Sequence, residues 1–288
     1  MTFGQMKFSV ITVTKDAARH IAACIDSVKT QTFDGVEHLI IDGVSSDDTV
    51  AIARSLLRAG DQLISEPDHG IYDAMNRGVA LAKGDYVLIL GADDFLVDRN
   101  VLADVAAFIA AEGAPDLIYG DLEVREVRGG RSVFRAPEPD KALELMICGC
   151  LPHQATFARR DLFAGKDGLF DTRYRVQADY DWFLRALAAP GLQIRHMRRV
   201  ISSFAMGGAS SQLQVGQQET YGIQNAFPLY RQPEWVEKRL LEFQRQTLAL
   251  RLQMLDVSSG SERLFAARVK RGVRRMVTRL SNLLAAKP

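Results

Sequence analysis

The chain has 288 residues, of which 47% are hydrophobic and 25% charged, the composition of an ordinary globular protein with a sizeable core. Its three cysteines are odd in number and form no ligand cluster, so they support neither a disulfide framework nor a zinc site. No apolar run reaches the roughly 18 residues of a membrane-spanning helix, and the apolar segment 8–14 is too short for a signal-peptide core. We therefore expect a cytoplasmic protein, either one large domain with an appendage or two smaller domains.

The formal net charge of +1 conceals an asymmetry along the chain. From Arg263 onward there are eight Lys and Arg residues and no Asp or Glu, whereas the preceding residues hold 28 basic and 35 acidic side chains. The body is therefore acidic and the C-terminal tail strongly basic. Such a tail indicates an anionic partner.

Apolar runs and helical patterns alternate through the first 120 residues. Strands are predicted at 7–14, 36–42, 62–65, 85–90 and 117–120, and helices at 21–30, from Ser45 or Ser46 to 56, at 71–82 and at 100–111. A serine at either of those positions is a suitable N-cap, and Gly84 is expected to end the third helix. The alternation predicts βαβ units and a Rossmann-like, mainly parallel sheet flanked by helices.

The pattern beyond Gly120 is mixed. A hairpin is predicted from 122–127 and 131–135, then a helix at 141–148, a strand at 155–158, a helix at 179–188, and strands at 192–196 and 200–204. From Pro233 onward the chain is predicted to be helical, with a break at 258–260. The predicted fold class is therefore α/β, with a mixed second region and a helical C-terminal tail.

Polar side chains stand at or just beyond the ends of the predicted parallel strands. They are Thr14, Asp42, Asp68 and the adjacent pair Asp93 and Asp94. Ligands of open α/β sheets collect beyond the carboxyl ends of the strands, so these groups are expected to share one cleft. Carboxylates repel phosphate unless a divalent cation or base recognition explains them, and we infer a metal-bridged ligand for Asp93 and Asp94. The alternative is that this pair caps the turn or helix near Phe95.

The chain carries neither GxGxxG nor GxxxxGK[ST] at the first βα turn, which argues against a nicotinamide-binding enzyme and a P-loop NTPase. Instead, four segments in order resemble the family 2 glycosyltransferases of the GT-A fold. They are SVITVTKDAARHIAACIDSVKTQTF, LIIDGVSSDDT, DHGIYDAMNRGVALAKGDYVLILGADD and ADYDWFLR. The resemblance spans about 7–211, and implies a catalytic domain at 1–211 with a nucleotide-binding half (about 1–120) and an acceptor-side half (about 121–211). A helical extension at 212–288 would follow it.

The resemblance implies a role for each matching residue. The nucleotide-sugar would be bound by Thr14, Asp42, Ser45, Asp68, Asn76 and Asp93. Asp94 would ligate a Mg or Mn ion that bridges the diphosphate, and Asp179 would be the general base. His153 would line the acceptor or metal region, with a structural histidine as the alternative reading.

Several positions depart from the family pattern. Gly43 follows Asp42 where a second aspartate is frequent, and Met75 stands where a positive charge is common, with Arg77 as a candidate replacement. Lys15 stands where an aromatic is frequent. Ala178 replaces the usual Glu, which leaves Asp179 alone as the base.

Three features near these motifs have a structural and a functional reading. The aromatic residues Tyr180, Trp182 and Phe183 could carry a sugar, but on a helix they are expected to be core. Asp181 and Arg185 are expected to form local ion pairs. The segment 207–211 could lie over the diphosphate, but a helix cap is the preferred reading.

The basic tail predicts an amphipathic helix at about 262–285. Its apolar face would be formed by Phe265, Val269, Val273, Met276, Leu280 and Leu283. We expect this helix to bind an anionic membrane surface, with packing on the catalytic domain or on a second subunit as the alternative. Nucleic acid is not expected, because no aromatic residues are interleaved with the arginines.

Together these features predict a metal-dependent, inverting hexosyltransferase. It would move a sugar from a nucleotide diphosphate-sugar to a hydroxyl of a glycan acceptor, lipid-linked if the tail binds the inner face of the cytoplasmic membrane, in surface polysaccharide or cell-envelope biosynthesis. Nucleotidyl transfer is an alternative, but TKDAARH is not a basic, glycine-rich phosphate loop. A catalytically silent nucleotide-sugar-binding protein, anchored by its tail to a membrane or partner, is the other alternative. The oligomeric state is open.

Overall fold

The computed structural model describes residues 6–127, 129–165, 168–207 and 213–252. The chain divides into two compact units, Met1–Gln232 and Pro233–Pro288. The first unit includes helix α7 (Leu213–Ala226). The described part of the second unit is one helix over 233–252, as predicted, and Lys238 there pairs with Glu234 at 3.0 Å. The predicted break at 258–260 and the amphipathic helix at 262–285 lie outside the described residues.

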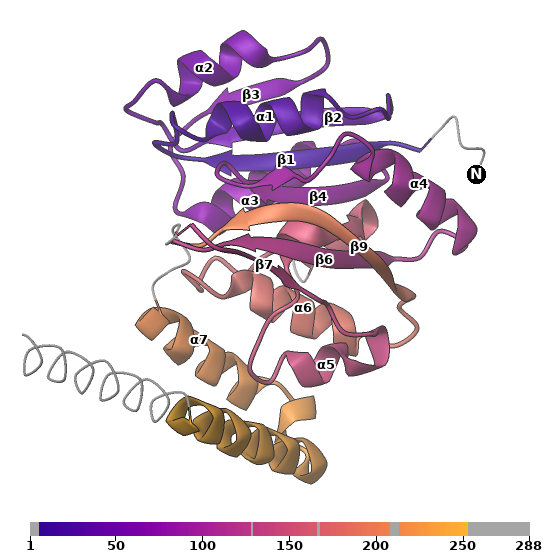
Figure 1. Ribbon diagram of the computed structural model, residues 1–288, viewed down its shortest axis with the longest axis vertical. Helices are drawn as coiled ribbons and strands as arrows, with labels where there is room; N and C mark the ends of the chain where they lie inside the picture. Colours follow the sequence, from indigo (N-terminus) through magenta and orange to yellow (C-terminus); the bar gives the residue numbers. More distant parts are fainter. Residues whose placement is uncertain (1–5, 128, 166–167, 208–212, 253–288) are drawn as a thin grey trace, which may run out of the picture. The chain divides into compact units, whose positions relative to one another are not determined.

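The first half of the chain forms a parallel sheet with the strand order β3-β2-β1-β4 (Figure 1). These strands are β1 (Phe8–Thr14), β2 (Val36–Asp42), β3 (Gln62–Ser65) and β4 (Tyr86–Gly91). The helices of this half are α1 (Ile21–Lys29), α2 (Thr49–Leu56), α3 (Ile71–Leu81) and α4 (Val101–Ala111). Each lies within a few residues of its predicted position, except that α2 begins later.

The second half extends the same sheet with mixed strand directions. Strand β8 (Thr156–Arg159) runs antiparallel to β4, and β6 (Leu117–Arg125) lies between β8 and β9 (Ile194–Ala205). The predicted hairpin is present as β6 and β7 (Arg131–Phe134). The remaining elements are β5 (Phe95–Leu96), α5 (Ala142–Leu145) and α6 (Ala178–Ala188).

Four predictions about element boundaries were wrong. The two strands predicted at 117–120 and 122–127 are one strand, β6, which ends at Arg125, and those predicted at 192–196 and 200–204 are one strand, β9, which begins at Ile194. A register shift occurs where β6 and β9 pair near Asp121. Neither Ser45 nor Ser46 begins α2, whose N-cap is Asp48. Gly84 does not cap α3 either. It packs against β1, where a Cβ would meet the backbone N of Ser9 at 2.5 Å.

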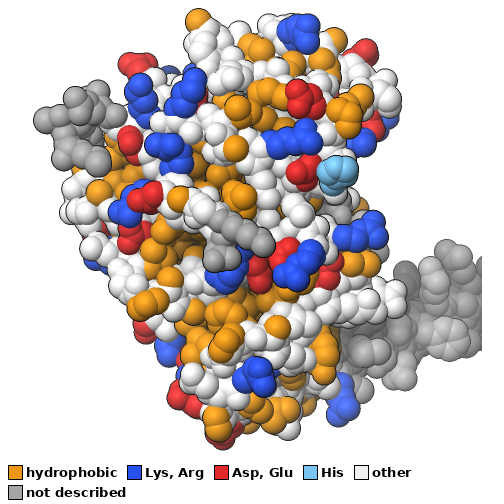
Figure 2. All heavy atoms as spheres, turned by 180° about the vertical axis from the view of Figure 1, so that it is seen from behind, with side chains coloured by type: hydrophobic (Ala, Val, Ile, Leu, Met, Phe, Trp, Pro, Cys, Tyr) orange, Lys and Arg blue, Asp and Glu red, His pale blue; other side chains and the backbone are white. Residues whose placement is uncertain are grey.

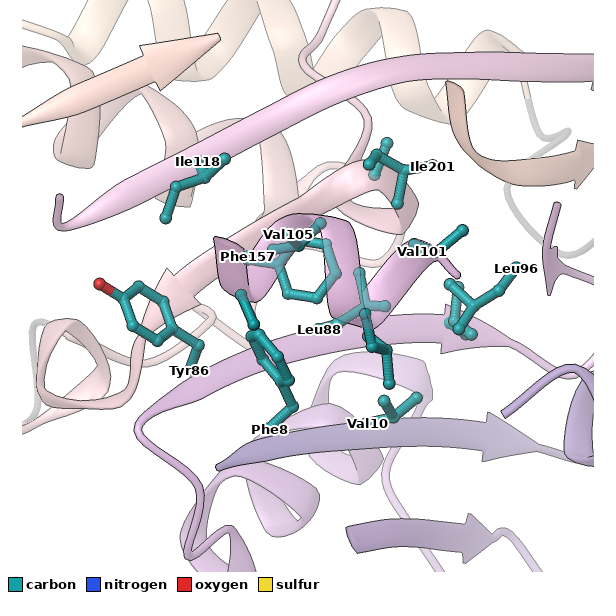
Figure 3. Packing of buried hydrophobic residues seen from close by; sticks show 14 of the residues in the cluster. Phe8, Val10, Tyr86, Leu88, Leu96, Val101, Val105, Ile118, Phe157 and Ile201 are labelled. Carbon is teal, nitrogen blue, oxygen red and sulfur yellow. The ribbon is translucent and has the colours of Figure 1, made fainter. Parts of the chain in front are cut away.

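The core lies on both faces of the sheet. Phe8 and Val10 of β1 point toward α4, where Val101 and Val105 pack against Leu88 and Phe157 (Figure 3). The intervening residues of β1 point the other way, because strand side chains alternate between faces. There Ile11 packs against Gly78 of α3, and aromatic residues of α6 line a small cavity together with Val87 and Ile89 of β4.

Apolar and charged side chains are intermixed on the face shown in Figure 2, with apolar surface gathered around its centre. A hollow of about 920 Å³ is lined by Val79, Tyr86, Arg159 and Phe163, among others. Tyr86 begins β4, so this hollow lies at the end of the strand opposite Asp93 and Asp94. In the described part of the chain, no helix has the length and apolar character needed to cross a bilayer.

One polar network is buried inside the sheet. His38 Nε2 lies 2.8 Å from Thr12 Oγ1, which in turn lies 3.4 Å from the thiol of Cys24. Burial of the His38 imidazole lowers its pKa from the ordinary 6.5 to about 4 because the charged form is desolvated. His38 is therefore neutral in the folded protein at neutral pH.

This buried histidine predicts an acid-dependent loss of stability. Its folded pKa lies below the unfolded value, so its contribution is present above about pH 6.5 and is lost as the pH falls toward the folded pKa of about 4. The loss should be on the order of 3 kcal/mol at most. Chemical unfolding at pH 7 and pH 4.5 should show a smaller loss for His38→Gln than for wild type, with exposed His20→Gln as the control. An equal loss in all three proteins would contradict this explanation.

Candidate active site

Asp42 closes β2, and its side chain is fully buried. Its Oδ2 accepts hydrogen bonds from the Ser45 backbone N–H at 3.0 Å and from Ser65 Oγ at 2.6 Å, and its Oδ1 accepts one from Ser45 Oγ. The carboxylate therefore ties the loop after β2 to the end of β3. Asp42 and Ser45, both predicted to hold the nucleoside, are engaged with each other here.

The loops after β1 and β2 hold each other in unusual conformations. Val44 has φ +59°, a left-handed value that is rare for a β-branched residue, and its side chain is 50% exposed. Asp16 has φ +50°, its backbone N–H donates to Ser45 Oγ at 2.8 Å, and its Oδ1 accepts from the Ser46 N–H at 2.7 Å. Strain of this kind costs on the order of 1–3 kcal/mol and often marks a binding loop.

Thr14 closes β1 in register with Asp42 of β2. Its Oγ1 is buried and has no hydrogen-bond partner within the described ranges. A buried hydroxyl without a partner is costly, so this atom is available to a ligand that enters between the two loops.

Asp68 lies at the same edge and fills the space beside Gly43. A Cβ on Gly43 would overlap the Asp68 carboxylate and lie 3.5 Å from Lys15 Cδ. The Asp68 carboxylate, from the loop after β3, therefore occupies the space next to Gly43, the position where a second aspartate is frequent in the family. Asp68 Oδ1 also accepts a hydrogen bond from the Gly70 N–H at 3.0 Å.

Helix α3 carries Met75, Asn76 and Arg77. The Asn76 amide donates to the Phe170 carbonyl at 2.9 Å and accepts from the Phe170 N–H at 3.0 Å, so it joins α3 to the segment before α6. Met75 is buried in the core. Arg77 pairs with Asp73 at 3.2 Å and with Glu66 at 3.6 Å, so its charge is already shared between two acids.

The carboxylates of Asp93 and Asp94 converge above Gly91. A Cβ on Gly91 would lie 2.9 Å from an oxygen of each. Asp94 is 1% exposed, and its oxygens accept hydrogen bonds from the Gly91 N–H at 3.2 Å and the Ala205 N–H at 3.1 Å. Burial and then the charge of Asp93 raise the pKa of Asp94 to about 7. Two adjacent carboxylates that are shielded from solvent favour a bound cation.

Arg125, at the end of β6, is a candidate site residue that the sequence analysis missed. Its guanidinium donates to the main-chain carbonyl of Asp93 and lies 4.5 Å from the ring centre of Phe95. Its Nε is buried without a partner among the residues described. Arg125 therefore puts a positive charge next to the paired aspartates. The sequence signal was only one basic residue in a predicted hairpin strand.

Asp179 lies in the first turn of α6 and is surrounded by donors. Its Oδ2 lies 3.1 Å from His153 Nδ1, and its Oδ1 accepts from the Tyr180 N–H at 2.9 Å. Tyr72 OH lies 2.9 Å from the same Oδ1 and 2.7 Å from the Val176 carbonyl, so its one hydrogen is shared between these two acceptors. Burial opposes ionisation of this carboxyl, but the bonds from His153 and Tyr72 outweigh it and keep its pKa below the ordinary range. Tyr72 was not singled out from the sequence.

His153 interacts with acidic groups from two parts of the chain. It precedes β8, whose Phe157 pairs with Leu88 of β4 in antiparallel register. The charge of His153 lowers the pKa of Asp94, opposing the effects of burial and of Asp93, and His153 also contacts Asp179. Asp94 and Asp179 therefore both interact with His153.

The other residues of α6 that were considered from the sequence have structural roles, as predicted. Tyr180, Trp182 and Phe183 are core residues, none more than 4% exposed. Asp181 pairs with Arg185 at 2.9 Å, the predicted local ion pair. Of the segment 207–211, residues 208–211 lie outside the described part of the chain.

The model of the family described as Glycosyl transferase family 2 matches residues 9–159. The chain belongs to this family. A PGL/p-HBAD biosynthesis glycosyltransferase of Mycobacterium tuberculosis is 42% identical to it over 208 residues, which cover 71% of this chain and 79% of the relative. An uncharacterized glycosyltransferase of the same species is 34% identical over 181 residues, 62% of this chain and 68% of the relative.

Solved structures support the GT-A fold of this glycosyltransferase. TarS of S. aureus matches with a TM-score of 0.62 and 21% identity, covering 83% of this chain and 43% of that chain. TarS 1–349 in complex with UDP-GlcNAc matches with a TM-score of 0.59 and 19% identity, covering 81% and 69%. The mannosyltransferase PcManGT of Pyrobaculum calidifontis, in complex with GDP-Man and Mn2+, matches with a TM-score of 0.55 and 18% identity, covering 76% and 63%.

Because the Asp42 carboxylate is buried and accepts three hydrogen bonds, its removal should destabilise the protein more than removal of the Asp68 carboxylate. Asp42→Ala leaves two hydroxyls and one N–H without their acceptor and should lower the free energy of unfolding by about 2–4 kcal/mol. Asp68→Ala removes one bond at a partly exposed position and should cost less than about 1 kcal/mol. Urea unfolding of the ligand-free glycosyltransferase measures both, and equal losses would show that the Asp42 network is not structural.

Proposed function

We propose that this glycosyltransferase moves a hexose from a nucleotide diphosphate-sugar to a hydroxyl of a glycan acceptor, with a divalent cation and with inversion at the anomeric carbon. The proposal is supported by His153, which lies 3.1 Å from Asp179 and interacts electrostatically with Asp94. Single displacement requires a leaving-group side and a basic side that flank one sugar. The two acidic groups supply these two sides.

The residues after β4 fit a Mg or Mn ion. Asp94 is the proposed ligand, and the convergence of its carboxylate with that of Asp93 above Gly91 supports a cation there. The described ranges contain no group of three or more His, Cys, Asp or Glu side chains placed to hold a metal. Further ligands would therefore be water and the diphosphate oxygens, as is usual for Mg²⁺. When bound, the cation would neutralise charge on the leaving diphosphate.

Other residues of the chain would bind and orient the substrates. Thr14 offers a buried hydroxyl to the nucleoside, beside the loop that Asp42 and Ser45 hold. Arg125 lies where its charge can offset the acids near the diphosphate. Asp179 is kept ionised by its hydrogen bonds and supplies the basic centre for the acceptor hydroxyl, an effect of about 10²- to 10⁴-fold.

The nature of the donor is supported by the structural relatives. TarS 1–349 was solved with UDP-GlcNAc, and PcManGT with GDP-Man and Mn2+. We therefore propose a nucleotide diphosphate-hexose for this chain as well. A catalytically silent protein would bind such a donor without releasing the nucleotide diphosphate.

The acceptor is proposed to be lipid-linked, in surface polysaccharide or cell-envelope biosynthesis. The basis is the sequence of the tail, where eight basic residues and no acidic ones follow position 262. A cationic amphipathic helix there would hold the enzyme peripherally at the inner face of the cytoplasmic membrane, near such an acceptor.

Removal of the proposed metal ligand should abolish turnover. With Mn²⁺ and a panel including UDP-GlcNAc and GDP-mannose, wild type should release nucleotide diphosphate, and Asp94→Ala should lose at least about 100-fold in rate because the leaving group is no longer neutralised. Asp26→Ala, at an exposed position of α1, is the control. Normal turnover by Asp94→Ala would overturn the metal role. Donor binding without release by wild type would favour the silent protein.

Charge reversal in the tail tests the membrane proposal. The full chain should sediment with phosphatidylglycerol vesicles and not with phosphatidylcholine vesicles. Each basic residue near the surface contributes about 1 kcal/mol, so reversing Arg271, Arg274 and Arg275 to Glu should weaken binding about 100-fold or more. Sedimentation that is unaffected by these reversals and by salt would contradict the proposal.

A further inference from the structure

Helix α7 places a carboxylate against the segment from which α6 begins (Figure 1). Glu219 Oε1 accepts a hydrogen bond from the Arg175 N–H at 2.7 Å. Its Oε2 accepts from the N–H groups of Val176 and of Gln177, the N-cap of α6, at 2.9 and 3.0 Å. Successive backbone N–H groups that converge on one anion form an anion-binding nest. Glu219 therefore holds this segment in one conformation.

The two helices also pack closely on either side of that carboxylate. About one turn before Glu219, Gly216 is buried, and a Cβ there would lie 2.9 Å from the side-chain N of Gln177. Further along α7, the buried amide of Gln224 donates to Tyr180 OH at 2.8 Å. Contacts before and after Glu219 therefore keep its carboxylate at the start of α6.

Val176 connects Glu219 to the proposed base. Its N–H donates to Glu219, and its carbonyl lies 2.7 Å from Tyr72 OH, which also lies 2.9 Å from Asp179 Oδ1. The same oxygen of Asp179 accepts from the Tyr180 N–H at 2.9 Å. The surroundings of Asp179 Oδ1 therefore depend on where the start of α6 lies.

We propose that Glu219 is a positioning residue for the transfer reaction, in which its carboxylate fixes the start of α6 and thereby the orientation of Asp179 toward the acceptor hydroxyl. This inference rests on the proposed function, in which Asp179 is the base. Glu219 acts through the backbone of the segment before α6 and is assigned no contact with a substrate. It lies beyond the four segments that resemble the family.

A carboxylate suits this position because every group it binds there is a donor. In Glu219→Gln one oxygen becomes an NH₂ group, which can only donate, so at least one of the bonds to the backbone is lost. Glu219→Asp keeps both oxygens on a side chain that is shorter by one methylene. A displacement of a catalytic group by about 1 Å can cost about 100-fold in rate.

The groups around Asp179 supply a second measurable effect. Burial opposes ionisation of this carboxyl, but the hydrogen bonds from His153, Tyr72 and the Tyr180 N–H outweigh it and keep its pKa below the ordinary range. The Cys150 thiol also faces Asp179, and burial raises the pKa of that thiol. A shift of the start of α6 weakens the bonds from Tyr72 and Tyr180, so the pKa of Asp179 rises.

Kinetics of the full chain test the proposal. The probe is release of nucleotide diphosphate, with Mn²⁺, from whichever donor of the panel wild type uses, with water or a glycan as acceptor. Glu219→Gln should lose about 10- to 100-fold in kcat while the KM for donor changes less than about threefold. The acid limb of its kcat profile should move to higher pH, and Glu219→Asp should fall between Glu219→Gln and wild type.

The control is Gln218→Ala, at an exposed position of the same helix, which should match wild type. Rates are measured at a temperature where circular dichroism shows every variant to be folded, so that a loss of stability is not counted as a loss of kcat.

Amide hydrogen exchange gives a measurement without turnover. A peptide that covers residues 175–177 should exchange at least about tenfold faster in Glu219→Gln than in wild type, because a hydrogen-bonded amide is protected. Peptides from β1 should exchange equally in the two proteins.

Three results would overturn the proposal, and they are distinguishable. If wild type turns over a donor and Glu219→Gln keeps both kcat, within about threefold, and the acid limb, Glu219 is only structural. If kcat falls but exchange at 175–177 does not change, Glu219 acts by another route. If wild type turns over no donor of the panel, the proposed function itself fails, and the role of Asp179 on which this inference rests fails with it.

Discussion

The register of three parallel strands is the constraint on which the site depends. Thr14 pairs with Asp42 across β1 and β2, and Val13 pairs with Gly91 across β1 and β4, so the three strands end at one line. Hydrogen bonding between strands fixes that register, and a slip of one residue would turn every side chain to the other face. Strand β8 then pairs antiparallel with β4, with Phe157 opposite Leu88. Residues far apart in sequence therefore meet at one edge.

The same geometry brings several carboxylates close together at one edge of the sheet. Hydroxyl groups donate hydrogen bonds to Asp42, the Arg125 guanidinium donates to the main-chain carbonyl of Asp93, and the His153 imidazole contacts Asp179. Asp94 receives only two backbone N–H bonds, and its pKa is the one that rises. Asp94, the acid of this edge whose pKa burial raises, is also the proposed ligand of the cation.

Much of the fold could be predicted from sequence because its signals are local. Strand β2 and strand β3 were placed at their observed bounds, since each is a short apolar run between turn residues. Strand β9 was split in two because it carries charged residues near Arg198 and Arg199 whose partners, Glu138 and Asp98, come from distant segments. The strand continues because pairing with β6, not its own composition, decides its length.

The candidate site, like the fold, was predicted where its signals are local in the sequence and missed where they depend on tertiary contacts. The acids after the strands were predicted because strand ends and side-chain types are visible in sequence. Arg125 and Tyr72 were missed, because their roles arise only when β6 and α3 are placed against Asp93 and Asp179.

The fit between Gly43 and Asp68 has an evolutionary consequence of its own. Since a Cβ at 43 would overlap the carboxylate at 68, that carboxylate must move when residue 43 is enlarged, and the effects of substitutions at the two positions should not be additive.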